Sequence, residues 1–305
     1  MSSFEIIEIT SIIGEIEKSP SDLFDDNDGR IQQKTGIEKI HRTTCSAYEL
    51  AISAVKKLKN LDSLKENIKF LIYVTQSPSF FLPNHASRIQ AEYGISNSAM
   101  CFDINQGCSG FVQALYLMNS LIGNSSDCGL IICSDTYSAH LSENDRSTQV
   151  LFSDGATATL IRGKGSWQII GSKHLTDGSG ADKLVKSINK SNKLYMDGAS
   201  IFQWTRRELG KQIKEVLIET NCSISNIEKF YLHQASKLVI TNVIKSLEIE
   251  TSKVPTTLGI TGNLVSSSIP FLLEQNFGDF NSYNLVLLSG FGVGLSSSTC
   301  LLKRT

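Results

Sequence analysis

The sequence has little that marks a secreted, membrane-spanning or nucleic-acid-binding protein. No apolar run approaches the length of a membrane span, and the residues after Met1 lack the basic segment and apolar core of a signal peptide. Lys and Arg number 29 against 30 Asp and Glu, giving a formal net charge of −1. Bulk charge therefore provides no attraction to nucleic acid or to anionic membranes. We expect a soluble, cytoplasmic protein with no nucleic-acid partner and no membrane insertion.

The sequence also lacks the cysteine pattern of a disulfide framework. It has seven cysteines, an odd number, with no Cys-x-x-Cys pair, and several of them lie inside apolar runs. This pattern is typical of reduced thiols in an intracellular protein. Five are expected to be core thiols, namely Cys101, Cys128, Cys133, Cys222 and Cys300.

What the sequence does contain is an alternation of short apolar runs and helix-period segments, which predicts an α/β fold. The expected strands are Phe4–Thr10, Phe70–Thr75, Met100–Ile104, Gly129–Ser134, Ala156–Arg162, Trp167–Leu175, Lys229–His233 and Leu285–Ser289. The expected helices include Ala47–Leu58, Pro83–Tyr93, Ser109–Ile122, Ile201–Glu219, Ser236–Leu247 and Ile269–Phe277. A chain of 305 residues can bury a large core in one or two domains.

An internal repeat runs through this pattern. Asn67–Gln76 is similar to Asn226–Gln234, 159 residues later, and Cys128–Ser134 is similar to Tyr283–Ser289, 155 residues later. The shared offset favours a duplicated α/β unit with a pseudo-twofold axis, although short apolar strands can also match by chance. We expect an N-terminal half at residues 1–165 and a C-terminal half at residues 166–305.

The duplication has a chemical consequence. At the same offset, the turn that carries Cys108 corresponds to the region of Asn263, and His233 ends the strand equivalent to the one that ends at Thr75. A pseudo-twofold axis brings equivalent loops together where the halves meet. Cys108, His233 and Asn263 can therefore converge in one cleft although they are distant in sequence.

Cys108 lies in the segment Asp103–Phe111, between small residues and an apolar run with helical spacing. The glycines and Ser109 around it allow backbone and ligand to approach closely. We expect Cys108 at a helix N-terminus, where free N–H groups and the helix dipole stabilise a thiolate and lower the thiol pKa. A nucleophilic cysteine is thus the leading functional hypothesis.

A set of motifs, in order and spacing along nearly the whole chain, resembles the thiolase superfamily and, within it, is similar to β-ketoacyl-acyl-carrier-protein synthase III. The motifs are Thr35–Ile37, Asp103–Asn105 with Cys108–Phe111, Val150–Ala156, His233–Ser236, Gly262–Asn263 with Ser268–Pro270, and Gly290–Gly294. The resemblance implies a five-layered αβαβα fold built from two duplicated halves, and a homodimer.

The resemblance also implies a catalytic trio of Cys108, His233 and Asn263. Cys108 accepts an acyl group from a thioester, and the N–H groups of Cys108 and of the Gly292–Val293 turn hold the oxyanion. His233 and Asn263 then donate to the enolate formed when a malonyl thioester loses CO₂, and a carbon–carbon bond is made. Neither a metal nor a cofactor is expected; acyl-coenzyme A or acyl carrier protein brings the substrate.

The substrate-facing positions depart from the family pattern. Arg30 stands where coenzyme-A-primed members commonly stack a Trp on adenine, whereas Arg146, the other half of that clamp, is retained. Lys34 remains near the tunnel mouth, and Leu82 matches a residue, often Phe, that closes the acyl pocket across the dimer. Two positions that commonly present basic residues to the carrier protein are Gln203 and Leu238. We further expect Phe202 and Ser236 to contact substrate.

Two alternatives to condensation stay open on the sequence. Related proteins with the same trio transfer acyl groups to hydroxyl or amino acceptors, in secondary metabolism or sugar modification, without forming a carbon–carbon bond. Other thiolase-type chains are structural subunits, but these typically lack the nucleophile that Cys108 provides. The presence of both His233 and Asn263 favours decarboxylative condensation. The acyl chain length, the donor carrier, the acceptor and the pathway are left open.

Overall fold

The strands fall into two groups, one formed by the first half of the chain and one by the second. The computed structural model describes residues 2–24, 29–123, 126–187 and 192–305. Its strands are β1 (Phe4–Ile13), β2 (Ile16–Lys18), β3 (Ile40–Arg42), β4 (Ile68–Val74), β5 (Met100–Ile104), β6 (Cys128–Asp135), β7 (Gly155–Gly163), β8 (Trp167–Thr176), β9 (Leu184–Lys186), β10 (Leu194–Met196), β11 (Lys229–Leu232), β12 (Leu285–Gly292) and β13 (Ser296–Arg304).

The α-helices lie between these strands. They are α1 (Pro20–Leu23), α2 (Arg30–Thr35), α3 (Ala47–Lys56), α4 (Leu61–Leu64), α5 (His85–Glu92), α6 (Gly110–Leu121), α7 (Arg146–Gln149), α8 (Gly198–Glu219), α9 (Lys237–Leu247), α10 (Leu258–Thr261), α11 (Ser268–Gln275) and α12 (Phe277–Phe280). Every strand and helix expected from the sequence is present, with ends that differ by a few residues.

The strand order repeats in mirror fashion about the middle of the sheet. It runs β11-β12-β13-β8-β1-β7-β6-β4-β5. In the first half β4 is parallel to β6, and β6 is antiparallel to β7; in the second half β11 is parallel to β12, and β12 is antiparallel to β13. The elements of the sequence repeat thus occupy equivalent places. The predicted division at residue 165 lies in the short connection between β7 and β8.

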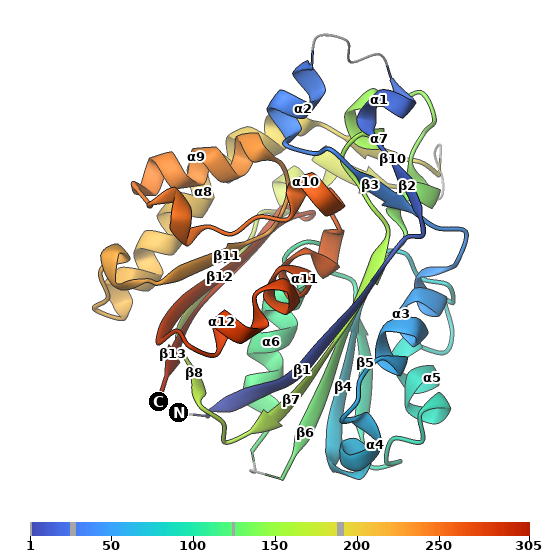
Figure 1. Cartoon of the computed structure of the whole chain (residues 1–305), viewed down its shortest axis with the longest axis vertical. Helices are drawn as coiled ribbons and strands as arrows, with labels where there is room; N and C mark the ends of the chain where they lie inside the picture. Colours follow the sequence, from blue (N-terminus) through green and yellow to red (C-terminus); the bar gives the residue numbers. More distant parts are fainter. Residues whose placement is uncertain (1, 25–28, 124–125, 188–191) are drawn as a thin grey trace.

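The two groups of strands meet at a single residue pair and then diverge. Phe4 of β1 pairs with Trp167 of β8. The helices α6 and α11 fill the space between the groups, since α6 contacts both β4 and β13, and α11 contacts both β1 and β11 (Figure 1). On the outer faces, α3 and α5 cover the first group and α8 covers the second (Figure 1). The expected αβαβα layering is confirmed.

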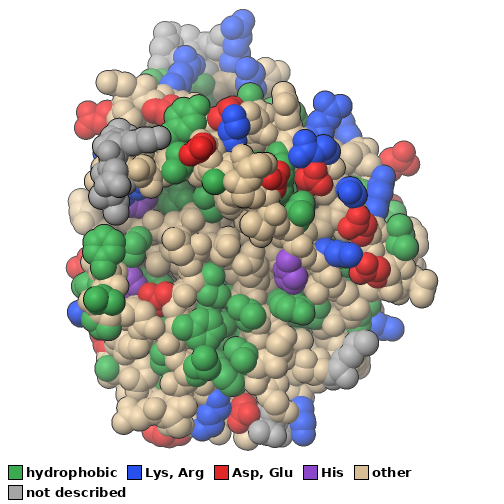
Figure 2. Space-filling view, turned by 180° about the vertical axis from the view of Figure 1, so that it is seen from behind, with side chains coloured by type: hydrophobic (Ala, Val, Ile, Leu, Met, Phe, Trp, Pro, Cys, Tyr) green, Lys and Arg blue, Asp and Glu red, His purple; other side chains and the backbone are tan. Residues whose placement is uncertain are grey.

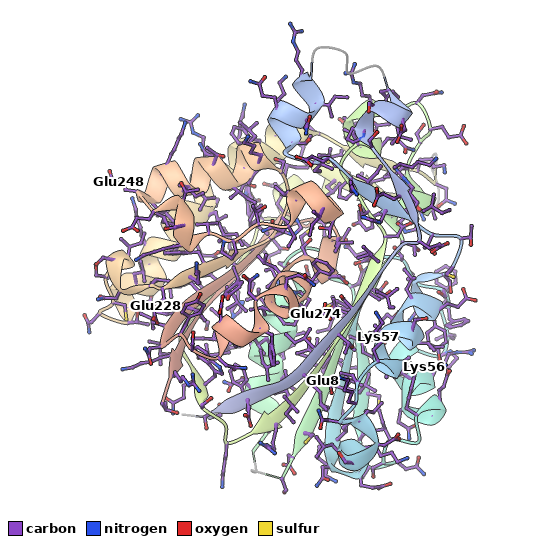
Figure 3. All side chains as sticks on the ribbon, in the orientation of Figure 1. Glu8, Lys56, Lys57, Glu228, Glu248 and Glu274 are labelled. Atoms are coloured by element: carbon purple, nitrogen blue, oxygen red, sulfur yellow. The ribbon has the colours of Figure 1, made fainter. Side chains whose placement is uncertain are left out.

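Polar contacts on β1 tie the layers together at Ser11. Lys57, at the end of α3, donates to the Ser11 carbonyl oxygen over 2.9 Å. From the middle layer, the Glu274 carboxylate of α11 accepts from the Ser11 hydroxyl. Figure 3 shows Lys57 and Glu274 on the two sides of β1. One strand residue therefore holds an outer helix and a middle helix.

Burial explains why α6 is the central helix. Its side chains Phe111, Leu115 and Met118 are fully buried. Gly129 of β6 admits Met118, because a Cβ at that glycine would lie 2.1 Å from the methionine sulfur. A close-packed interior leaves no room to adjust such a contact. The helix that follows Cys108 is therefore fixed against the sheet.

The strand β13 (Ser296–Arg304) is not predicted by the sequence. Its first three residues, Ser296–Ser298, lack the β-branched and aromatic side chains that mark strands. The segment is nevertheless paired on both sides, with β12 and with β8. Tertiary pairing in the middle of a sheet has outweighed local propensity. The pairs β2–β3 and β9–β10 form separate two-stranded sheets of three residues per strand, too short for an alternating pattern to predict them.

The surface carries charged side chains of both signs, interspersed over the face seen in Figure 2. Hydrophobic side chains gather in the lower half of that face (Figure 2). Among the described residues, no helix is long and apolar enough to cross a membrane. All seven cysteines belong to the described part of the chain, and all are free thiols.

Candidate active site

Cys108 lies in the turn between β5 and α6. The chain leaves β5 at Ile104, and the Gly110 N–H bonds to the Gly107 carbonyl oxygen over 2.8 Å to close the turn. Cys108 precedes Ser109, the N-cap of α6. The expectation that this cysteine sits at a helix start is confirmed.

The end of β12 packs directly against this turn. A Cβ at Gly290 would lie 2.4 Å from the Cys108 carbonyl oxygen, and a Cβ at Gly292 would lie 3.0 Å from the Cys108 Cβ and 3.1 Å from its Sγ. Only residues without a side chain allow this approach. The glycines of the C-terminal motif thus serve to bring a backbone strand against the nucleophile.

His233 follows β11 at the carboxyl end of the parallel pair β11–β12. Its backbone N–H donates to the Ser289 carbonyl oxygen over 2.9 Å, and its ring meets the Phe291 ring edge to face at 5.4 Å. The neighbouring Gln234 accepts hydrogen bonds from Thr256 and from the Thr257 N–H. That glutamine connects the histidine turn to the segment that leads to Asn263.

Asn263 is held on both sides by the segment before β7. Its N–H donates to the Leu151 carbonyl oxygen, and its carbonyl oxygen accepts from the Ser153 N–H, both over 2.9 Å. The side-chain Oδ1 accepts from the Val265 N–H over 2.9 Å. The amide NH₂ group is therefore the part of this side chain left to donate to a ligand. Gly262 has a φ of 62°, a conformation that favours glycine.

Cys108, His233 and Asn263 line one cavity of about 440 Å³. The cavity is mostly apolar and extends from the thiol past Phe202 and Val239 to Lys34 and Arg146 at α2 and α7. Residues from α2, α7, α8, α9, β9, β10 and β12 form its sides. The structure brings together the three residues that the sequence predicted to converge.

The other predicted site residues divide into two groups. Lys34, Arg146, Phe202, Ser236 and Gly292 line the cavity with Cys108. The side chains of Arg30 and Leu82 do not line it. Arg30 is an exposed residue at the start of α2, and Leu82 lies in the loop before α5 with 87% of its surface exposed. Val293 lines a neighbouring cavity instead.

The electrostatics of the thiol differ from the expectation. Burial raises the pKa of Cys108, and the carboxylate of Asp135 raises it further, whereas a backbone hydrogen bond lowers it. A helix N-terminus by itself lowers a thiol pKa, but at Cys108 the effect of burial is larger. The thiol is therefore neutral near pH 7.

His233 is held as a neutral imidazole. Burial lowers its pKa from 6.5 to about 3, so the imidazole is uncharged near neutral pH. Its Nδ1 is buried and has no hydrogen-bond partner among the described residues. A neutral imidazole can accept a hydrogen bond at one ring nitrogen and donate one from the other without carrying a charge into the apolar cavity.

Several residues near Cys108 were not found from the sequence. Asp135, at the end of β6, is buried and accepts from the Gln76 N–H over 2.7 Å and from the Ser266 hydroxyl; burial raises its pKa to about 6. Tyr137 and Phe152 pack beside the thiol in an apolar cluster. A polar residue at the end of a buried strand was the available signal for Asp135, whereas loop positions such as Tyr137 carry none.

The comparisons with known proteins agree with this geometry. The family model described as 3-oxoacyl-(acyl-carrier-protein) synthase III matches residues 102–178, and the model of its C-terminal part matches residues 217–304. The first match spans Cys108, and the second spans His233 and Asn263.

Similar proteins extend over almost the whole chain. Beta-ketoacyl-(acyl-carrier-protein) synthase III of Lactococcus lactis is 33% identical over 302 residues, 93% of each chain, and the enzyme of that name from Streptococcus pneumoniae is 32% identical over 298 residues. The solved structure of 3-oxoacyl-(acyl-carrier-protein) synthase III from Aquifex aeolicus matches with a TM-score of 0.90 at 25% identity, over 99% of this chain and 100% of that one. The Pseudomonas aeruginosa enzyme gives 0.89 at 26%, over 99% and 98%. The thiolase-like fold is thus confirmed, and the chain belongs to the β-ketoacyl-acyl-carrier-protein synthase III family of acyltransferases.

Proposed function

We propose that the chain loads an acyl group onto Cys108 and condenses it with a malonyl thioester, releasing CO₂ and a β-ketoacyl thioester. The observation that carries this proposal is the shared cavity of Cys108, His233 and Asn263. One nucleophile and two neutral hydrogen-bond donors meet there in apolar surroundings. This combination suits the stabilisation of an enolate, which needs donors that do not hand over a proton prematurely.

In the loading step, the Cys108 sulfur attacks the carbonyl carbon of an acyl thioester. The new bond joins Sγ to the acyl carbon, and the carbon–sulfur bond of the donor breaks. The thiol proton passes through His233 to the departing donor thiolate, so that a free thiol leaves. The Cys108 and Val293 N–H groups, with Gly292 giving the close approach, hold the oxyanion of the tetrahedral intermediate.

In the condensation step, the malonyl carboxylate leaves as CO₂ and its electron pair remains on the adjacent carbon as an enolate. The Asn263 amide and the His233 imidazole donate to the enolate oxygen. The enolate carbon attacks the acyl carbon, and the bond to Cys108 breaks. One proton from solvent returns the sulfur to the thiol, so each turnover consumes a proton.

The outer end of the cavity is suited to a carrier with phosphate groups. Lys34, Arg146 and Ser236 line that end, and Arg30 lies on the same helix as Lys34. We infer that these side chains bind the phosphate-bearing arm of coenzyme A or of acyl carrier protein. Charge removal at Arg146 is expected to raise KM for the donor more than it lowers kcat.

We further propose a homodimer built on the edge of the first group of strands. The outermost strand there is β5, and an open strand edge can pair with a second copy. Next to it the loop before α5 exposes Phe81 by 86% and Leu82 by 87%. Adjacent apolar side chains this exposed suit burial by a partner. Leu82 is placed to close the acyl pocket of the second copy.

We also infer that the protein works in the cytoplasm with no cofactor beyond its thioester substrates. The seven free thiols support a reducing compartment. Each step proposed above uses only side chains, backbone N–H groups and the substrates themselves.

The proposal is tested in two stages. The protein is first incubated with acyl-coenzyme A donors, and intact mass is recorded; an acyl adduct is expected in the wild type and not in Cys108→Ala. Malonyl-acyl carrier protein is then added and CO₂ release is measured, with a strong fall expected in His233→Ala and Asn263→Ala. Absence of any adduct refutes the enzyme proposal. An adduct that passes to a hydroxyl or amine acceptor without CO₂ release would establish acyl transfer instead.

A further inference from the structure

A buried hydrogen bond joins the end of β6 to the turn that follows Asn263. We propose that Asp135 and Ser266, the two partners in this bond, position the Asn263 amide for its hydrogen bond to the enolate. We call this pair the clasp. The inference rests on the proposed function, in which Asn263 donates to that enolate. It adds two positioning residues that do not themselves line the cavity with Cys108.

The turn after Asn263 has a backbone conformation that must be held by its surroundings. Val265 has a φ of 52°, in the left-handed region that a β-branched residue rarely adopts. Such a conformation persists only where neighbouring contacts hold it. The Val265 N–H donates to the Asn263 Oδ1 over 2.9 Å, and this bond leaves the NH₂ group of the amide to donate to a ligand. The direction of that NH₂ group therefore depends on whatever keeps the turn in place.

The clasp ties this turn to the nine-stranded sheet. The Asp135 Oδ2 accepts from the Ser266 hydroxyl and, over 3.4 Å, from the Ser266 N–H. The other oxygen, Oδ1, accepts from the Gln76 N–H over 2.7 Å. Asp135 ends β6, which pairs with β4 on one side and with β7 on the other, so its backbone is fixed. Asp135 and Ser266 are both buried, and hydrogen bonds to a buried carboxylate are among the stronger ones in proteins.

The other contacts of Asn263 explain why loss of the clasp would act on one step of the reaction. The Asn263 backbone is held separately, through its hydrogen bonds with Leu151 and Ser153. A variant without the clasp should therefore keep the asparagine at the cavity but lose the fixed direction of its amide. In the proposed mechanism, acylation of Cys108 does not use that amide, whereas the enolate formed with CO₂ is stabilised by it. The clasp should thus affect CO₂ release and leave loading intact.

The test compares two rates: acylation of Cys108 by acetyl-coenzyme A, and CO₂ release when malonyl-acyl carrier protein is added to the acylated protein. In Ser266→Ala the acylation rate should stay near that of the wild type, while CO₂ release falls about tenfold, as a displacement of a fraction of an ångström would give. Asp135→Asn keeps the test valid if Ser266→Ala does not fold. Its amide can accept at only one of the two former oxygen positions, so CO₂ release should again fall without slower acylation.

The matched control is Ser134→Ala, one residue before Asp135 on β6. Ser134 is fully buried, and its hydroxyl donates to the Ala47 carbonyl oxygen over 2.6 Å, on the opposite face of the strand. The control loses a buried hydrogen bond of the same kind, away from the turn after Asn263. Both of its rates should therefore stay near those of the wild type.

The outcomes separate this inference from the proposed function. CO₂ release near the wild-type rate in both Ser266→Ala and Asp135→Asn overturns the inference. An equal fall of acylation and CO₂ release in those variants does so too, because it would show a general loss of structure, as does an equal fall of CO₂ release in Ser134→Ala. If the wild type forms no acyl-cysteine or releases no CO₂, the proposed function itself has failed, and this inference fails with it.

Discussion

Substitution of Gly292 by alanine tests whether the close approach of β12 positions the nucleophile. The new Cβ would lie 3.0 Å from the Cys108 Cβ and 3.1 Å from its Sγ. Both distances are tighter than ordinary contacts, so the cysteine side chain must yield by a few tenths of an ångström. The backbone itself accepts alanine, because Gly292 belongs to a strand and is not among the glycines with positive φ.

The displacement gives an estimate of the kinetic effect. A misplacement of 1 Å in an active site can cost on the order of a hundredfold in rate. A shift of a few tenths of an ångström should then slow acylation of Cys108 by about tenfold. Tight contacts in a packed interior cost about 1 kcal/mol or more, and a lower entropy of the unfolded chain offsets part of that cost. We expect the melting temperature to fall by only about 2 °C.

The assay is single-turnover acylation by acetyl-coenzyme A, followed by intact mass, with thermal unfolding measured in parallel. The matched control is Gly278→Ala in α12, where a Cβ would meet nothing within 4 Å. Alanine favours the helix there, so the control should keep the wild-type rate and an equal or higher melting temperature. Wild-type acylation in Gly292→Ala would refute the argument that β12 positions the sulfur.

Three further predictions follow from the geometry. The pKa of His233 is about 3 in the folded protein against 6.5 for a free histidine, so below pH 6.5 the unfolded chain binds the additional proton and stability falls. Between pH 7 and pH 5 the loss should be about 2 kcal/mol in urea unfolding, and His233→Gln should not show that part of the loss. Asn263→Asp keeps the acceptor for the Val265 N–H but loses the amide donor, so acyl-cysteine should still form while CO₂ release from malonyl thioester falls by about a hundredfold or more; equal loss in both steps would contradict a role specific to the enolate. The double variant Phe81→Asp with Leu82→Asp should sediment as a monomer where the wild type sediments as a dimer, and an unchanged sedimentation coefficient would argue against this face as the interface.

The sequence was sufficient for those features that depend on local pattern. Apolar runs bounded by glycine and polar residues predict β4, β6 and β12, and the common offset between such runs predicts the duplication. The trio followed from the resemblance, and equivalent loops of a duplicated fold explain why three distant residues meet. These three residues, Cys108, His233 and Asn263, can be predicted without knowledge of how the chain packs.

Features that depend on tertiary surroundings cannot be predicted from the sequence. The serine run that opens β13 is a strand only because it is paired on both sides. Burial raises the pKa of Cys108. The local sequence around a helix start does not reveal how deeply that residue is buried. The apolar cluster around Cys108 combines Tyr137, Phe152 and Leu184 from three separate segments, so no pattern along the chain could have joined them.

The division of the site residues between the two halves has a consequence for the nascent chain. Cys108 belongs to the first half, whereas His233, Asn263 and the glycines of β12 are all synthesised later, the last of them near the C-terminus. During synthesis, domains generally fold from the N-terminus as units. A ribosome-bound chain that has made only its first half therefore carries the thiol without the histidine and the asparagine that we propose act with it. Under the proposed mechanism, turnover waits for those later segments, and an incomplete chain released early is expected to be catalytically silent.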